Sequence, residues 1–191
     1  IVGSRRFLPS APPKAGTITG RYLSSRVSPD GRTVAYLRAS TVDASVSLQF
    51  LDVRTNSLGP AISTAETLDF WVGLAWRPDS TAVATVLGTE RLHVWDRVTG
   101  RQIEQHRSTG DRLTTVAFSG DGSRVLVGTR DGWVKSIAGA GLRAGAPVRV
   151  SDSSPVTTLA VDGPGGRAGA TPQGGGRGVD LDAAPVPRTH A

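Results

Sequence analysis

Residues 92–101 read L-H-V-W-D-R-V-T-G-R, and this stretch decides the fold. Its apolar side chains alternate with polar ones up to Trp95 and Asp96, and a Thr-Gly pair follows. This pattern is typical of a half-buried strand that enters a tight turn. Related stretches stand at 48–52 (LQFLD) and at 134–138 (VKSIA). We therefore interpret the chain as a series of repeats.

A turn that contains aspartate precedes each of these strands. It reads SPDG at 28–31, RPDS at 77–80 and SGDG at 119–122. Asp-Gly between apolar runs indicates a hairpin, because glycine adopts the positive φ that such a turn demands. The aspartates are 49 and 42 residues apart, and the closing strands are 44 and 42 residues apart. A period of about 40 to 50 residues is in the range of propeller repeats.

Each repeat predicts a four-stranded antiparallel blade, so the expected fold class is all-β: a β-propeller segment of three good blades and one degenerate blade. No helix longer than two turns is expected. The outer strand of each blade should begin near 59–62, 101–103 and 146–148, where proline is tolerated. The other strands of the good blades are expected near 22–27, 33–38, 47–53, 73–76, 82–87, 91–96, 113–118, 124–128 and 133–137.

The chain divides into three segments. Residues 1–20 are rich in proline and glycine and predict a linker or an edge strand. Residues 21–162 hold the blades. The glycine-rich segment 163–191 predicts a degenerate blade or a disordered tail. The first strand of that blade is expected before it, at 156–161, and a degenerate closing strand at 179–184.

The composition argues against several classes of chemistry. Cysteine is absent, which excludes disulfides, thiolate metal sites and cysteine nucleophiles. The three histidines stand in separate regions, the serines lack a nucleophile elbow, and the glycine-rich tail lacks the lysine of a phosphate loop. We therefore expect no enzyme, no cofactor and no metal site. We expect structural or exposed roles for His93, on the polar side of a strand, and His106, in a loop.

We expect a cytoplasmic protein, and the hydropathy predicts no membrane span in this chain. The net charge is +6 and the pI is near 10.9, but the arginines are scattered along the chain. Nucleic-acid binding, which needs a basic stripe, is therefore a weaker hypothesis. No apolar run approaches the length that crosses a bilayer. Because the chain begins at Ile1, we expect that it comes from a longer protein.

Trp95-Asp96, Val116-Ala117-Phe118 and the Asp-Gly turns resemble the WD-repeat (WD40-type) family of β-propellers, over residues 21–162. The SPDG turn also occurs in bacterial propellers of the TolB type. The resemblance implies a hydrogen-bonded network of histidine, aspartate, serine or threonine, and tryptophan in each blade. The network is incomplete here. Gln105 precedes His106 where the family has glycine, Thr89-Glu90 occupies the loop before Trp95, and Ile137 replaces tryptophan.

The aromatic residues suggest where partners bind. Trp76 and Trp95 lie in apolar columns and are expected in the core. Other aromatic and arginine residues fall in or beside loops on the face where partners of the family often dock, and such residues anchor many interfaces. Each could equally pack between blades. The candidate contact residues are Phe70, Trp71, Arg112, Arg130 and Trp133.

These observations predict a noncatalytic module for protein–protein interaction or sensing within a larger bacterial regulatory or signalling protein. The alternative is a gating or regulatory propeller domain of a hydrolase or a TolB-like protein. The family closes its ring with about seven blades, and this chain supplies three good ones and one worn. We therefore expect that a protein partner or the remainder of a longer propeller completes the ring, or that the open arc self-associates. A compact four-blade ring is the less favoured alternative.

Overall fold

The computed structural model describes residues 21–67, 70–137, 145–161, 167–173 and 177–180. Within these ranges the regular elements are the strands β1 to β16, and none is a helix. The strands form four antiparallel sheets, which follow one another along the chain and which we name blades 1 to 4. The all-β prediction is therefore confirmed. The linker or edge strand expected at 1–20 lies outside the described residues.

The bounds of the strands agree with the repeat register. Blade 1 contains β1 (Arg21–Val27), β2 (Thr33–Ala39), β3 (Ser45–Asp52), β4 (Ser57–Leu58) and β5 (Ile62–Thr67). Blade 2 contains β6 (Gly73–Trp76), β7 (Ala82–Val86), β8 (Arg91–Asp96) and β9 (Gln102–Arg107). Blade 3 contains β10 (Leu113–Phe118), β11 (Val125–Thr129), β12 (Trp133–Ile137) and β13 (Gly145–Arg149). Blade 4 contains β14 (Val156–Val161), β15 (Arg167–Pro172) and β16 (Arg177–Asp180).

Two blades depart from the four-strand pattern. In blade 1 the outer position is split between β4 and β5, which both pair with β3. Pro60 lies between them and has no N–H to donate to the ladder, which accounts for the interruption. Blade 4 has three described strands, and β15 forms across a poor β-former sequence. Ala170 of β15 is buried in one cluster with Val150 and Val156, and this packing stabilises the strand.

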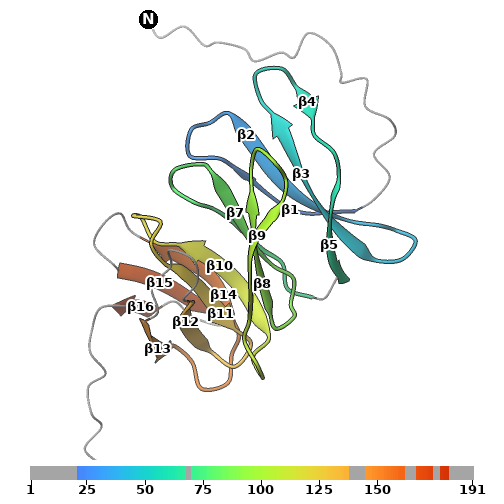
Figure 1. Cartoon of the computed structure of the whole chain (residues 1–191). Helices are drawn as coiled ribbons and strands as arrows, with labels where there is room; N and C mark the ends of the chain where they lie inside the picture. Colours follow the sequence, from blue (N-terminus) through green and yellow to red (C-terminus); the bar gives the residue numbers. More distant parts are fainter. Residues whose placement is uncertain (1–20, 68–69, 138–144, 162–166, 174–176, 181–191) are drawn as a thin grey trace, which may run out of the picture.

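The blades stand side by side in a row, with blades 1 and 4 at its opposite ends (Figure 1). Their first strands contact one another in turn, β1 with β6, β6 with β10 and β10 with β14. Consecutive antiparallel sheets that meet through their first strands are the arrangement of a β-propeller. The predicted fold class, a propeller segment with a degenerate last blade, is confirmed.

Apolar clusters fill the spaces between consecutive blades. We call the face of a blade toward the next blade its forward face, and the opposite face its rear face. Between blades 1 and 2, the forward residues Ala35 and Leu37 pack against the rear residues Trp76, Val83 and Trp95. A second cluster joins blades 2 and 3, and a third joins blades 3 and 4. The prediction that Trp76 and Trp95 are core residues is confirmed, since they are 8% and 3% exposed.

The turn aspartates act as turn formers, as expected. In Asp30, Asp79 and Asp121, Oδ1 accepts a hydrogen bond from the backbone N–H two residues further on, over 2.9 to 3.0 Å. Gly31 and Gly122 have positive φ in these turns, at 69° and 70°. These turns fix the link between the first and second strands of blades 1 to 3.

Candidate functional site

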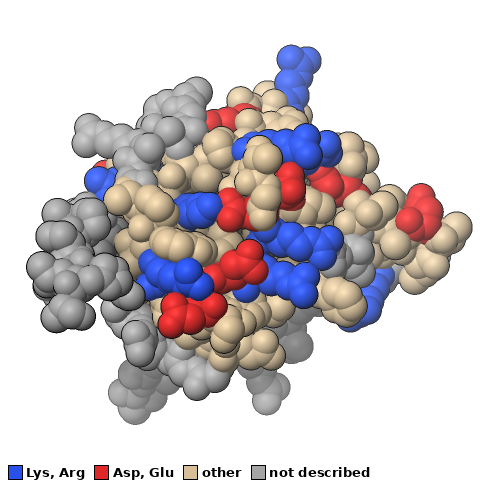
Figure 2. Space-filling view, turned by 90° about the horizontal axis from the view of Figure 1, so that it is seen from below, with Lys and Arg blue, Asp and Glu red and all other residues tan. Residues whose placement is uncertain are grey.

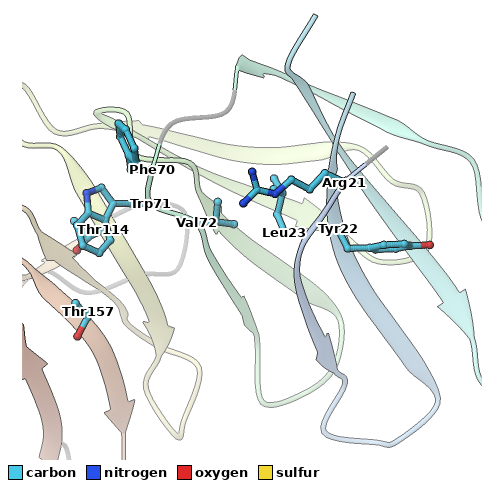
Figure 3. Close-up of a pocket in the computed structure, with 8 residues that line it drawn as sticks. All are labelled: Arg21, Tyr22, Leu23, Phe70, Trp71, Val72, Thr114 and Thr157. Carbon is cyan, nitrogen blue, oxygen red and sulfur yellow. The ribbon is translucent and has the colours of Figure 1, made fainter. Parts of the chain in front are cut away.

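The candidate site is a hollow of about 570 Å³ to which all four blades contribute. We call it the axial hollow. Its walls come from the start of β1, from the residues that lead into β6, and from the starts of β10 and β14. The lining residues are Arg21, Tyr22, Leu23, Phe70, Trp71, Val72, Thr114 and Thr157 (Figure 3).

One repeat position contributes a lining residue to the hollow in each blade. Leu23, Val72 and Thr114 each stand seven residues before the turn aspartate of their blade. Thr157 follows the first paired residue of β14, as Thr114 follows that of β10. Because the first strands lie next to one another, equivalent positions converge on the same space. The site is therefore a product of the repeat.

Aromatic side chains dominate one side of the axial hollow. The side chain of Phe70 is 96% exposed, and Trp71 beside it is half-buried. Figure 3 shows the guanidinium of Arg21 directed toward Leu23 and Val72 on the other side. Tyr22 points away from these residues in the same view and packs against Tyr36 instead, with 5.8 Å between the ring centroids. An apolar wall thus faces a cation.

The two threonines donate their hydroxyl protons within the protein. Thr114 Oγ1 donates to the carbonyl oxygen of Val156 over 2.5 Å, and Thr157 Oγ1 donates to that of Thr171 over 2.8 Å. Their hydroxyl oxygens can still accept hydrogen bonds. The lining residues include no carboxylate, histidine or cysteine. The arrangement suits a ligand with an apolar or aromatic part and an acidic group.

The structure brings some of the predicted contact residues together. Phe70 and Trp71 both line the axial hollow. Arg112 precedes β10, and its carbonyl oxygen accepts a hydrogen bond from the N–H of Arg130 over 2.8 Å. These two arginines therefore lie at the end of blade 3 from which Thr114 reaches the hollow. Trp133 does not line the hollow, and it is the first residue of β12, the strand expected at 133–137.

Trp133 packs locally at the outer part of blade 3. The guanidinium of Arg149 in β13 lies 5.2 Å from the centre of its ring. The N–H of Trp133 donates to Oγ1 of the buried Thr129 over 3.1 Å. The sequence did not single out Arg21, Leu23, Val72, Thr114 or Thr157 as site residues. The repeat position that Leu23, Val72, Thr114 and Thr157 share is the signal that could have found these four.

A buried polar cluster in blade 2 surrounds His93, which is 3% exposed and not on a solvated strand face. Its ring stacks on that of Trp95, with centroids 5.6 Å apart and planes inclined by 20°. Nδ1 lies 2.8 Å from Oε1 of Gln102, and Nε2 lies 3.3 Å from Oε1 of Glu66. Because Glu66 belongs to β5 of blade 1, this cluster joins two blades. His93 has the structural role expected of it, but in the interior.

Lys135 occupies the position of blade 3 that His93 occupies in blade 2. Its ammonium lies 2.5 Å from Oδ2 of Asp111, which precedes β10. Burial acts to raise the pKa of Asp111, but hydrogen bonds from Lys135 and Ser108 outweigh it and hold the pKa below its usual value. A polar side chain from this strand position thus contacts an acidic residue in both blades.

The prediction for His106 was wrong, because this residue was expected in a loop and lies in β9.

Basic and acidic side chains are intermingled on one face of the molecule. Figure 2 shows acidic and basic side chains next to one another on the face seen there. Several form ion pairs, such as Arg97 with Asp30 over 2.8 Å and Arg107 with Glu90 over 3.1 Å. A phosphate-binding surface instead gathers basic residues in one stripe. Among the described residues, no three or more histidine, cysteine, aspartate or glutamate side chains are grouped so that they could hold a metal ion.

None of the segments that the structure describes forms a helix of the length and hydropathy needed to cross a membrane.

No protein-family model and no curated protein matches the sequence. Two solved structures are similar in fold. Hydrazine synthase of Kuenenia stuttgartiensis matches with a TM-score of 0.64 and 17% identity, over 86% of this chain and 45% of that one. U3-55K matches with a TM-score of 0.66 and 13% identity, over 82% of this chain and 46% of that one.

The chain therefore spans less than half the length of each of these two structures. At such low identity the likeness concerns the fold, and it agrees with the succession of antiparallel blades.

Proposed function

We propose that the chain is a noncatalytic, WD-type propeller module that binds a protein partner at the axial hollow. The observation that carries this proposal is the nearly complete exposure of Phe70 beside Trp71 at the rim of the hollow. Large exposed aromatic side chains mark interaction sites, because burying them against a partner removes much apolar area from water.

The WD-type assignment is supported by the interior of blade 2. Trp95 Nε1 donates to Oγ1 of Thr85 over 2.9 Å, and His93 stacks on the same indole. This corresponds to the tryptophan and threonine part of the network that the resemblance implies. In blade 3 the corresponding strand carries Ile137, so the network is restricted to one of the good blades.

The chemistry of the lining favours a peptide segment over a small polar substrate. Phe70, Trp71 and Val72 supply apolar contact, and Arg21 supplies one cation on the opposite side. A partner segment with an aromatic or aliphatic residue next to an aspartate or glutamate would complement both sides. Arginine adds specificity because its guanidinium can bind a carboxylate through two hydrogen bonds.

The test is a selection of random peptides on the immobilised chain, followed by titration of the enriched peptides by fluorescence anisotropy. We expect peptides that combine an acidic with an aromatic or aliphatic residue. The double variant Arg21→Ala, Phe70→Ser should weaken their binding at least about tenfold, the size of effect that loss of one interface anchor gives. The control is Val98→Ser, at an 83% exposed position in the turn after β8.

Equal binding of the same peptides to the wild type and the double variant would place the interaction elsewhere. Enrichment of no peptide above the unselected library would refute the proposed function.

A further inference from the structure

Two blade faces lie at the ends of the row, the rear face of blade 1 and the forward face of blade 4. Residues at one repeat position allow the rear faces to be compared. Trp76 of blade 2 and Phe118 of blade 3 are buried against the preceding blade, at 8% and 6% exposure. Val27, which holds the same position in blade 1, is 60% exposed. An interface position of the repeat is thus open to solvent in blade 1.

A second repeat position gives the same result. Tyr22 of blade 1 is 57% exposed, whereas Leu113 at the equivalent position of blade 3 is fully buried. Val34 of blade 1 is half-buried, whereas Val83 and Val125 at its equivalent positions are fully buried. Tyr36 on the same face is buried, at 7% exposure. At the positions of Val27, Tyr22 and Val34, the rear face of blade 1 therefore carries the apolar residues of a blade–blade interface without the burial that such an interface gives.

The forward face of blade 4 carries small residues instead. Alternation along β14 and pairing with β15 put Thr158, Ala160, Gly169 and Thr171 on this face, and all four are exposed. One interface inside the row also joins a small forward residue to a large rear residue. Between blades 2 and 3, Ala75 packs against the cluster that contains Phe118. Ala160 holds the repeat position of Ala75, as Val27 holds that of Phe118.

We propose that a second copy of this chain docks head to tail, so that the forward face of blade 4 of each copy covers the rear face of blade 1 of the other. Large residues would then meet small ones, as Phe118 and Ala75 do between blades 2 and 3. Two copies supply eight blades, which is within the range of about four to eight that propellers use. Because both ends of each copy are engaged, the assembly closes with two-fold symmetry and leaves no end for further addition. This inference does not rest on the proposed function.

The first measurement is the mass of the wild-type chain by light scattering after size exclusion, over a dilution series. We expect twice the 19.8 kDa of one chain. Val27→Asp and Ala160→Lys each put a charge into both junctions of the ring, so each variant alone should be monomeric. The control Val98→Asp carries its charge at an exposed turn away from both faces and should remain a dimer.

The decisive measurement is an equimolar mixture of Val27→Asp and Ala160→Lys. In a head-to-tail ring the mixed dimer has one junction with wild-type residues and one junction in which the introduced carboxylate opposes the introduced ammonium. The mixture should therefore regain the mass of a dimer. Far-ultraviolet circular dichroism checks that each variant keeps its β spectrum. Tyr22→Asp and Thr158→Lys replace any variant that unfolds, since both positions are exposed.

A monomeric wild type at every concentration would overturn the proposal. It would mean that a second copy of this chain does not cover the two end faces. Dimers that resist both variants would place the contact elsewhere, and loss of the dimer only in Val27→Asp would indicate pairing of two first blades. A mass that grows with concentration beyond a dimer would indicate an open chain of copies.

Discussion

The indole Nε1 of Trp95 donates a hydrogen bond to Oγ1 of Thr85 over 2.9 Å, with both residues buried in blade 2. The bond ties β8 to β7, and the same indole packs in the cluster between blades 1 and 2. A buried N–H without a partner costs about 1 to 3 kcal/mol, so Thr85 is what allows a tryptophan in this cluster. The Trp95–Thr85 pair thus stabilises both the pairing of strands inside blade 2 and the packing of blade 2 against blade 1.

Trp95→Ala should lower the free energy of unfolding by about 3 to 5 kcal/mol, because it removes a large aromatic side chain from a packed cluster. Thr85→Val keeps the shape but leaves the indole N–H unpaired, and should cost about 1 to 3 kcal/mol. Urea unfolding followed by fluorescence measures both. Val98→Ala, at an exposed turn position, should change stability by less than about 0.5 kcal/mol. Equal midpoints for the three variants would contradict this view of the core.

Ser80 stands where the other two turns have glycine, and its φ is +63°. It is buried, and its Oγ accepts a hydrogen bond from the N–H of Asp30 in blade 1 over 3.0 Å. Ser80→Ala loses this bond and keeps the strained backbone, so it should destabilise by about 1 kcal/mol. Ser80→Gly loses the bond but relieves about 1 kcal/mol of strain, and should lie close to the wild type. A lower melting temperature for Ser80→Gly than for Ser80→Ala would show that strain is negligible at this position.

The strands of this fold could be predicted because the same pattern of apolar strands and turns recurs in each repeat. Alternation and turn spacing gave nine inner strands whose bounds agree with the structure to within two residues. The exception is β15, where Arg167–Pro172 has weak β propensity. Its stabilising contact is the burial of Ala170 among Val134, Val150 and Val156 of blades 3 and 4, and local sequence cannot reveal such a contact.

The candidate site was predictable only in part. Phe70 and Trp71 stood out because large aromatic residues are unusual next to a loop. Thr114 and Thr157 carry no such signal, and they become lining residues only because the first strands converge. His93 was expected on the polar side of a strand with a structural or exposed role, and the local sequence could not decide between the two. Glu66 of β5 in the preceding blade lies against its ring, and the side chain is buried.

Two glycines with the same backbone conformation offer a matched test of packing. Gly110 and Gly132 have φ of +83° and +81°. A Cβ on Gly110 would meet nothing within 4 Å, whereas a Cβ on Gly132 would lie 2.2 Å from the carbonyl oxygen of Ser151. Gly110→Ala should therefore cost about 1 to 2 kcal/mol of backbone strain. Gly132→Ala adds a backbone clash and should cost about 1 to 3 kcal/mol more.

Urea midpoints of these two variants measure the difference. Similar losses for both would mean that the segment that follows β13 can move away from the turn between β11 and β12 at little cost.

The last prediction concerns acid. A hydrogen bond from the Ser28 hydroxyl, another from the N–H of Arg32, and the nearby Arg97 guanidinium lower the pKa of Asp30 to about 2, from 3.8. The unfolded chain therefore binds this proton more readily than the folded one. The stability that Asp30 contributes is fully present above pH 3.8, and is lost as the pH falls from there toward 2.

Asp30→Asn mimics the protonated state at every pH. The wild type should resist urea better than Asp30→Asn at pH 6, and the gap between their midpoints should close as the pH falls toward 2. Asp43 has its pKa lowered to about 2 by hydrogen bonds from Ser40 and Ser45, so the same comparison with Asp43→Asn is a second instance. A gap that stays constant between pH 6 and pH 2 would mean that these carboxylates contribute through shape rather than charge.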